Sequence, residues 1–506
     1  MQSTENDINA QEKSEMSSQA FFEKLDEIAR RRGFFYISDE IYGGISGMYD
    51  YGSTGTLIKR NIEGMWRKHF LNLDENFYEI EAPDISLKNV FVASGHITNF
   101  VDPMIKCEKC GTFYRADRFI EENAGIKAEG LSASELDSII KEKGLKCPKC
   151  KGSFGNVKYI NMMFPVQVGI EDAVEAYLRP ETAQCAYTNF MRQFDIQRNR
   201  LPMGLAIVGK AFRNEISPRQ LLIRQREFTQ AELQIFFDPS KVNEQERWQE
   251  VENYNLILLL QGSSDIVRVS CKEANEGKGI PKLYVYYMAK VQQFYLEVLH
   301  IPEQNFRLRE LSESEKAFYN KIHFDVEVYL KSVGKFIEVG GVHYRTDHDL
   351  TGHQNISKKS QTITYEGRKF IPHVIELTTG VDRVFFAIMD NFYVEAKDRE
   401  WDWFAFPPRI APQLFAVFPL MNKEELASTA RKIFENLRKN YSGMYDSKGS
   451  IGKRYARADE IGIPFSITID FDTLNDNTVT IRLRNTTKQE RVKIEDIPKF
   501  IEENSQ

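Results

Sequence analysis

The chain has 506 residues and a net charge of −6, with 42% hydrophobic and 28% charged residues, and this length predicts two or three domains rather than one core. A membrane protein is excluded because no apolar run approaches the ~20 residues that cross a bilayer, and a cytoplasmic protein is expected because the polar N-terminus lacks the apolar centre of a signal peptide. The net negative charge argues against a protein that coats nucleic acid, so any nucleic acid must be held by a local basic patch.

The N-terminal part combines helix-like and strand-like stretches. Residues 1–16 are polar and are expected to be disordered. Helical spacing follows over 21–35 and 57–71, on either side of a glycine-rich turn region, and a strand-like stretch then reaches Pro83.

Four of the six cysteines form two Cys-x-x-Cys pairs, Cys107 with Cys110 and Cys147 with Cys150. Two such pairs can present four thiolates tetrahedrally to Zn²⁺, and the Gly, Lys and Pro residues around them suit tight metal-binding turns. Iron, a cytosolic redox pair and a degenerate ribbon are the alternatives. Four sulfur ligands leave no open coordination position, so we predict a structural zinc ribbon over residues 103–158 and no catalysis there.

The stretch "GKAFRNEISPRQ" (209–220) ends an apolar run with charged residues. Its start overlaps "GLAIVGKA", which fits part of a phosphate-loop pattern. That interpretation fails because the intervening residues make a strand and the last position is Ala211 instead of Ser or Thr. Alternate residues of a strand share a face, so Arg213 and Glu215 are expected to point the same way. Arg213 would then hold the α-phosphate of ATP, and Glu215 would accept a hydrogen bond from the adenine amine.

The next stretch, "REFTQAELQIFF" (226–237), also alternates. One face suits a core. The other is too polar to be buried without a ligand or solvent, and it carries Arg226, Phe228, Gln230, Glu232 and Gln234. We predict an antiparallel pair of strands joined by the loop at 217–219, offering an arginine for phosphate, a ring for adenine and acids for an ammonium group. A solvated sheet face is the alternative.

The rest of the chain divides into three parts. Residues 239–312 show long helical patterns, including 248–260 and 284–299, and are predicted to be a mostly helical insertion. Strand patterns return before an apolar helix that begins near Gly380. After the paired prolines at 407–408, helix, strand and hairpin alternate and predict a separate α/β module.

Three of these features together resemble the three motifs of class II aminoacyl-tRNA synthetases. They are the helix and strand that end at Pro83, the Phe-Arg-x-Glu sequence with Arg213, and the Gly-Val-Asp-Arg sequence that ends at Arg383. The closer resemblance is to the dimeric, archaeal and eukaryotic type of glycyl-tRNA synthetase and covers nearly the whole chain. It rests on "EIYGGISGMYDYG", "ASGHITNFVDPM", "LRPETAQ", "GKAFRNEISPRQ", "REFTQAEL", "RTDHDL" and "GSIGKRYARADEIGIPF".

The resemblance implies an α+β fold in which a class II antiparallel sheet is flanked by helices. The catalytic domain is then made of residues 17–102, 159–238 and 313–405. The zinc ribbon (103–158) and the helical insertion (239–312) interrupt it, and an anticodon-binding α/β domain follows over 410–506. A homodimer is implied by the first motif alone.

The resemblance also assigns roles. It places Arg213, Glu215 and Arg226 with ATP, Phe228 on the adenine face and Arg383 at the γ-phosphate end. Around glycine it places Glu181, Glu232, Glu376 and Thr378. The implied reaction activates glycine with Mg²⁺-bound ATP and then transfers it to tRNA(Gly). Exclusion by size is sufficient for glycine, the smallest amino acid, so no editing domain is expected.

Two positions depart from the family pattern near the pocket. Cys185 stands where glycine is usual, and Thr378 stands where serine is usual. An RNA-binding paralogue without activity, or with altered specificity, is therefore the alternative function. A basic tRNA-binding surface is predicted for the C-terminal part from Lys453, Arg454, Arg457, Arg482 and Arg484, with a merely solvated surface as the alternative. Trp401 and Trp403 are expected to pack at the domain junction.

Overall fold

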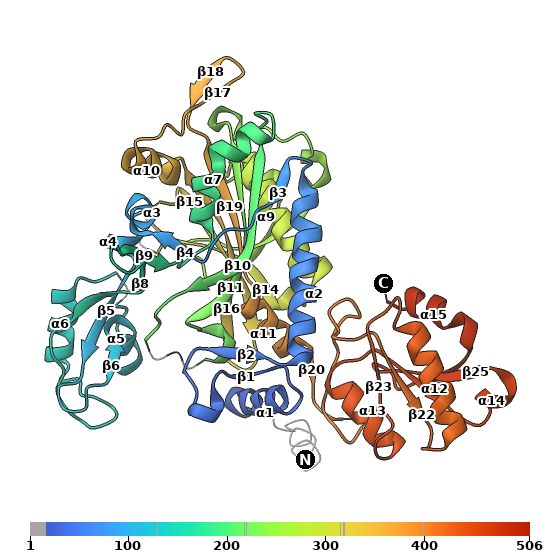
Figure 1. Ribbon diagram of the computed structural model, residues 1–506. Helices are drawn as coiled ribbons and strands as arrows, with labels where there is room; N and C mark the ends of the chain where they lie inside the picture. Colours follow the sequence, from blue (N-terminus) through green and yellow to red (C-terminus); the bar gives the residue numbers. More distant parts are fainter. Residues whose placement is uncertain are drawn as a thin grey trace, which may run out of the picture.

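The computed structural model describes residues 17–128, 130–216, 218, 220–313, 315–316, 319–397 and 399–505. The predicted disorder of residues 1–16 lies outside this range. Among the described residues, no helix is both long and apolar enough to cross a membrane. A central sheet with its helices, a side domain near the cysteines and a C-terminal module make up the molecule (Figure 1).

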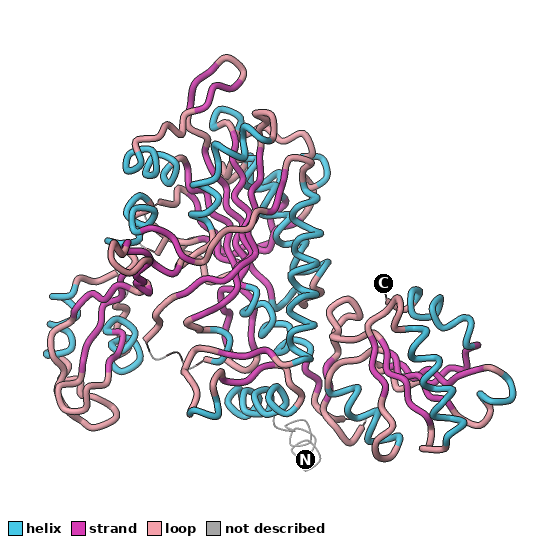
Figure 2. The backbone as a smooth tube through the Cα atoms, in the orientation of Figure 1, coloured by secondary structure: helices cyan, strands magenta, loops and turns pink. Residues whose placement is uncertain are grey.

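The central sheet has nine strands in the order β13-β12-β14-β15-β16-β19-β11-β10-β3. All neighbours are antiparallel except the parallel pairs β10 with β3 and β12 with β14. Figure 2 shows its strands running through the middle of the molecule. Their bounds are β3 Phe77–Glu79, β10 Met203–Phe212, β11 Glu227–Phe237, β12 Asn255–Leu259, β13 Ile266–Ser270, β14 Phe306–Glu310, β15 Ile322–Leu330, β16 Lys335–Thr346 and β19 His373–Gly380.

The two faces of this sheet differ in chemistry, as the alternation in 226–237 predicts. Ala231, Leu233 and Ile235 of β11 belong to the main hydrophobic core. That core includes side chains of α1 (Ser18–Arg31), α2 (Ser53–Phe70), α9 (Lys282–Gln293) and α11 (Val381–Phe392). On the opposite face, Ile207 and Phe236 pack with side chains of α7 (Ala183–Ile196) and α10 (His348–Ser357). The polar side chains of β11 share that second face.

The segment 239–312 differs from its prediction. The stretch 248–260, expected to be helical, forms a 3₁₀ turn at Trp248–Glu250 and then strand β12. The segment supplies three strands of the central sheet, so it is not a separate helical layer. The continuous apolar run at 256–260 misled the prediction because period alone cannot separate a buried strand from a buried helix. The helix expected at 284–299 is confirmed as α9 and a π-helical turn, Phe294–Val298, and α8 (Cys271–Glu276) precedes it.

Short elements surround the central sheet. A three-stranded sheet in the order β4-β9-β8 adjoins the side domain, and the pairs β1-β2, β17-β18 and β20-β21 form two-stranded sheets. The bounds are β1 Phe35–Ile37, β2 Tyr49–Tyr51, β4 Ile85–Leu87, α3 Lys88–Ala93, α4 His96–Asn99, β8 Phe164–Val168, β9 Val174–Leu178, β17 Ile363–Tyr365, β18 Arg368–Phe370, β20 Tyr393–Val394 and β21 Trp403–Phe404.

The cysteine-containing segment folds as a small domain at one side of the molecule (Figure 1). Its sheet has the order β6-β5-β7, and a small core of its own includes Ile105, Phe119, Leu136 and Ile140. Ser132 begins its second helix with a capping box, in which the Ser132 and Glu135 side chains bond each other's backbone N–H groups. The bounds are β5 Val101–Lys106, β6 Phe113–Arg115, α5 Ala116–Ala124, α6 Ala133–Glu142 and β7 Lys158–Asn161.

The C-terminal part is an α/β module with its own core, as predicted. Its five-stranded sheet has the order β23-β22-β24-β25-β26, and the helices α12 and α15 contribute to the core. The bounds are β22 Phe415–Pro419, α12 Glu424–Leu437, β23 Gly443–Tyr445, α13 Ile451–Glu460, β24 Phe465–Ile469, α14 Thr473–Asp476, β25 Thr478–Leu483, β26 Gln489–Lys493 and α15 Ile497–Glu503.

The predicted basic surface of this module is wrong for three of its five residues. Arg454, Arg482 and Arg484 are 3%, 5% and 2% exposed. Arg454 donates to the carbonyls of Leu420 and Gly449, and Arg484 donates to the carbonyl of Phe406 at 2.6 Å. Arg454 and Arg484 thus hold backbone segments together, and Arg482 pairs with the buried Asp459. A strand pattern does not reveal such contacts. The three arginines are therefore not available to RNA.

Asp459 is the charged centre of the junction between the C-terminal module and the preceding chain. It is fully buried and pairs with Arg482 through both oxygens, at 2.8 and 2.9 Å. It also accepts from Arg399 at 2.8 Å and from the indole N–H of Trp401 at 3.0 Å. Trp403 is buried under Arg399. Packing of both tryptophans at the junction is confirmed.

We expect Asp459→Ala to lower the free energy of unfolding of the C-terminal module by about 3–5 kcal/mol. The substitution leaves the guanidiniums of Arg399 and Arg482 without their counter-charge. Urea unfolding followed by circular dichroism measures this. Glu435→Ala is the matched control, since Glu435 and Arg438 form an exposed pair at 3.6 Å, and it should change stability by less than about 0.5 kcal/mol. Similar small changes in both variants would contradict the role of Asp459.

Candidate active site

A polar cleft lies on the second face of the central sheet. In the strand register, Glu232 of β11 stands opposite Thr378 of β19, and Gln234 stands opposite Glu376. His343 of β16 is opposite Glu376 from the other side. The second face thus brings two predicted acids and the predicted threonine together, and all three line one cleft with about 820 Å³ of empty space. Glu181, which ends the loop before α7, completes the predicted glycine-binding set in this cleft.

Arg345 organises the acids and was missed as a functional residue by the sequence analysis. Its guanidinium is 1% exposed and donates to Asp349 at 2.9 Å and to Glu376 at 2.8 Å. It also lies 3.5 Å from Glu181. Its only sequence signal is its place in "RTDHDL", where a charged residue follows an apolar strand. One cation therefore faces three buried carboxylates.

Glu232 is the acid that Arg345 does not contact. It is 3% exposed and accepts a hydrogen bond from the Thr182 hydroxyl at 2.7 Å. Burial, together with the nearby carboxylates of Glu376 and Glu181, raises the pKa of Glu232 to about 8. In the unliganded cleft this side chain is therefore mostly protonated at neutral pH.

The neighbouring groups titrate differently. Burial raises the pKa of Glu181, but the charges of His96 and Arg345 outweigh it and hold that pKa below its usual range. Burial raises the pKa of Glu376 although Arg345 opposes the shift. Burial and the neighbours His323 and Arg345 lower the pKa of His343 well below its ordinary value, so this imidazole stays neutral. The cleft keeps a net negative charge.

Arg213 lies at the other side of the cleft. Its Nε donates to the Pro180 carbonyl at 3.1 Å, and its guanidinium lies over the rings of Phe228 and Phe100 at 5.2 and 5.4 Å. Arg383 opens α11 and donates to the Ile223 carbonyl at 3.0 Å while pairing with Glu338 at 3.1 Å. The structure brings Arg213, Phe228 and Arg383 into one cleft with the acids.

Two details of the nucleotide-side prediction differ in the structure. Strand β10 ends at Phe212, so Arg213 and Glu215 lie in the loop beyond it. The alternation of side chains along a strand therefore does not determine where these two side chains point. Glu215 does line the cleft, but its carboxylate pairs with Arg224 at 2.5 Å. Arg226 is not among the cleft-lining residues, because its guanidinium donates to the carbonyls of Glu215 and Ser46 at 3.0 and 2.8 Å. Arg226 thus holds the loop that carries Arg213.

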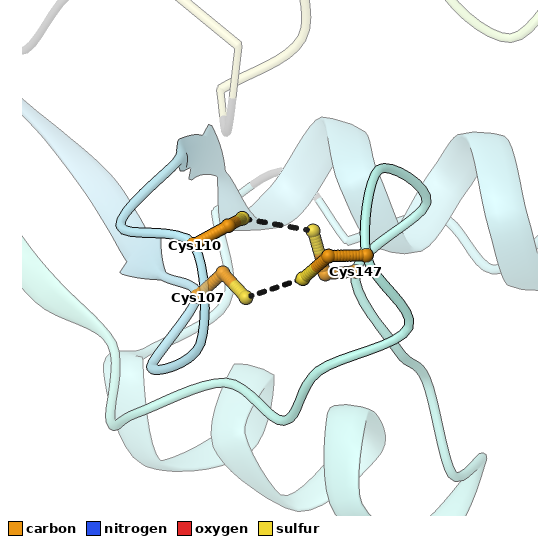
Figure 3. Close-up of side chains that lie close together, drawn as sticks. Cys107, Cys110 and Cys147 are labelled. Carbon is orange, nitrogen blue, oxygen red and sulfur yellow. Dashed lines mark hydrogen bonds between the residues drawn. The ribbon is translucent and has the colours of Figure 1, made fainter.

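The four cysteines of the side domain form a second candidate site. The Sγ atoms of all four lie within 4.8 Å of one another. Cys107 Sγ is 3.5 Å from Cys150 Sγ, and Cys110 Sγ is 3.7 Å from Cys147 Sγ (Figure 3). Four sulfurs bound tetrahedrally at a zinc–sulfur distance of about 2.3 Å are about 3.8 Å apart. The cluster therefore fits a four-thiolate metal centre, away from the cleft.

Comparison with known proteins supplies the family. Residues 166–392 match the tRNA synthetase class II core domain (G, H, P, S and T), and residues 415–504 match the anticodon binding domain. The chain is 38% identical to a glycine–tRNA ligase of Thermococcus sibiricus and to one of Pyrococcus horikoshii, with 95% of this chain and 98% of each relative aligned. It is 37% identical to the glycine–tRNA ligase of Aeropyrum pernix over 94% of this chain and 95% of that relative.

The chain belongs to the glycine–tRNA ligase family. The predicted class II fold, with its C-terminal anticodon-binding domain, is confirmed. The cleft has arginines and an aromatic ring on one side and buried acids on the other. Cys185, one of the two departures, is buried in α7 and 3.8 Å from Arg179, and it does not line the cleft. Thr378, the other, lines the cleft and donates to Glu376 at 3.1 Å.

We expect Glu232→Gln to stabilise the unliganded protein by roughly 1 to 3 kcal/mol at pH 7. Glu232 has a raised pKa in the folded state, so in the wild type it costs stability as pH rises from the unfolded value near 4.3 towards 8. A glutamine has no such cost. The gain in unfolding free energy should shrink towards zero as pH falls to about 4.5. A gain that is independent of pH would contradict the assignment.

Proposed function

We propose that this protein joins glycine to the 3′ end of tRNA(Gly) in two steps, using ATP with Mg²⁺. In the first step the glycine carboxylate attacks the α-phosphorus of ATP, which gives glycyl-adenylate and releases pyrophosphate. In the second step the terminal ribose hydroxyl of tRNA attacks the activated carbonyl and releases AMP. The observation that carries this proposal is that one cleft contains both the buried acids around Arg345 and the two arginines Arg213 and Arg383.

The acid cluster suits a small ammonium compound. Arg345 neutralises part of the charge of Asp349, Glu376 and Glu181, and Glu232 holds a proton in the absence of another cation. An ammonium group placed among Glu181, Glu232 and Glu376 would replace that proton. Thr378, opposite Glu232, stands at the edge of the same group. We propose that these side chains crowd the space around the ammonium group so that glycine enters and larger amino acids are excluded without an editing domain.

The arginine side suits a triphosphate. Arg213 would hold the α-phosphate, with Phe228 stacking on adenine, and Arg383 would hold the γ-phosphate end. When Mg²⁺ is bound with ATP it offsets the phosphate charge. The protein then contributes orientation and charge stabilisation, and we assign no side-chain base. Glu215 would meet the adenine amine only after adjusting its pairing with Arg224.

Glycine-dependent exchange of pyrophosphate into ATP, measured without tRNA, tests the proposal. We expect exchange with glycine and none with alanine or serine. Arg213→Ala should reduce the exchange at least about 100-fold, since it removes charge stabilisation at the reacting phosphorus. Its thermal unfolding should stay close to that of the wild type, because among the described residues the Arg213 side chain makes one hydrogen bond, to a backbone carbonyl at 3.1 Å. Absence of exchange with every amino acid would favour the RNA-binding paralogue.

We propose that the four-cysteine cluster holds one structural Zn²⁺. Elemental analysis should find about one zinc per chain, and Cys147→Ser should lose it and lower the stability of the side domain, because metal binding and folding are coupled in small domains. Cys271→Ser is the matched control, since Cys271 is equally buried but lies outside the cluster. It should keep its zinc. Iron in place of zinc, or no metal in the wild type, would overturn this assignment.

Three further expectations accompany the proposed function. The C-terminal module would bind the anticodon region of tRNA(Gly), as its match to the anticodon binding domain supports. A homodimer is proposed from the family resemblance of the first motif. A cytoplasmic location is proposed from the composition of the chain.

A further inference from the structure

A buried carboxylate that the proposed reaction does not use, Asp382, is among the residues that line the cleft. Asp382 is 2% exposed and stands directly before Arg383 at the start of α11. Its Oδ1 accepts from the Lys59 ammonium at 2.7 Å and from the Tyr51 hydroxyl. Its Oδ2 accepts from the backbone N–H of Thr229 at 2.5 Å. One side chain therefore joins α11 to β2, α2 and β11.

The hydrogen bond between Thr229 and Asp382 connects two parts of the proposed ATP site. Thr229 follows Phe228, and Asp382 precedes Arg383. The bond from Thr229 N–H to Asp382 thus ties the strand that carries the proposed adenine-stacking ring to the helix that carries the proposed γ-phosphate arginine. A shift in Asp382 would change the separation of the two ends of the ATP site.

Lys59 holds Asp382 in its ionised form. The lysine is 9% exposed, its ammonium lies 4.4 Å from the centre of the Tyr51 ring, and it is not among the cleft-lining residues. Burial raises the pKa of Asp382, but the charge and hydrogen bond of Lys59 outweigh burial and keep that pKa below its usual range. Without Lys59, a buried carboxylate would lose its counter-charge and take up a proton or move.

We propose that Lys59, on helix α2, is a positioning residue for ATP that acts through Asp382. Lys59 fixes the charge and place of Asp382, and Asp382 fixes Phe228 relative to Arg383. The inference rests on the proposed function only in taking ATP as the ligand of this cleft. It predicts an effect on ATP that does not extend to glycine, because the acid cluster around Arg345 makes none of the Asp382 contacts.

The test compares Lys59→Met with Lys290→Met in the exchange reaction. Lys290 of α9 is the control because it is 7% exposed, pairs with Glu250 at 3.0 Å and is not among the residues that line the cleft. We expect Lys59→Met to raise KM for ATP about tenfold and to change KM for glycine less than about twofold, since small displacements of binding groups cost this much or more. Lys290→Met should leave KM for ATP unchanged and should cost less thermal stability than Lys59→Met, because its partner Glu250 is 40% exposed whereas Asp382 is buried.

Two further variants keep the test decisive if Lys59→Met folds poorly. Lys59→Arg retains the charge and should keep KM for ATP within about threefold of the wild type. The double variant Lys59→Met with Asp382→Asn removes both buried charges, so it should recover stability relative to Lys59→Met alone and still show the raised KM for ATP. A normal KM for ATP in the double variant, or an equal rise in both KM values, would overturn the proposal.

Failure of the proposed function would be distinguishable. If the wild type shows no glycine-dependent exchange, the ligase proposal fails, and the role of Lys59 is then judged by equilibrium binding of ATP alone. The same tenfold loss of affinity in Lys59→Met, without a loss in Lys290→Met, supports the positioning role. Equal affinity in wild type and Lys59→Met overturns it.

Discussion

The buried guanidinium of Arg345 is the interaction on which the amino-acid side of the cleft depends. It joins β16, β19, α10 and the loop before α7 through its contacts with Glu376, Asp349 and Glu181. A buried cation among carboxylates is stable only when its charge is matched, and here the acids outnumber it. The proton on Glu232 removes one further negative charge, but the three carboxylates that Arg345 contacts still outnumber it. The pocket thus keeps a negative charge that an ammonium ligand would offset.

The strands can bring these acids together because β16 and β19 approach closely beside the cleft. Gly340 of β16 faces this contact, and a Cβ atom there would lie 2.3 Å from the Thr378 carbonyl oxygen. A larger residue would therefore push Thr378 and its neighbour Glu376 away from Arg345. The main core packs against the other face of the sheet and holds the strands in place. The positions of the polar groups therefore depend on apolar packing on the opposite face.

Local patterns predicted much of this arrangement but not its long-range contacts. The alternation in 226–237 predicted both faces of β11, and the cysteine spacing predicted the four-sulfur cluster. Arg345 could not be assigned from spacing, because its partners Glu181 and Glu376 are far away in the chain and meet it only across folded strands. The burial of Arg482 was missed for the same reason. Its position on the strand suggested exposure, but it pairs with Asp459 in the folded module and is buried. At 248–260 an apolar run was compatible with two structures, and sheet pairing with β14 decided for the strand.

The molecule has several separate hydrophobic cores, so the strands that form the cleft do not share a core with the side domain or the C-terminal module. The side domain and the C-terminal module each have a separate hydrophobic cluster, and the cleft strands belong to neither. A core as small as that of the side domain gives little stability by itself, so a bound metal would contribute much of its folding free energy. Loss of that metal would then unfold a side domain whose core is not shared with β10, β11 or β19. An effect on the ligand contacts of the cleft would pass through places where the two regions meet, such as the pocket that Arg118 and Phe119 of the side domain line together with Arg224.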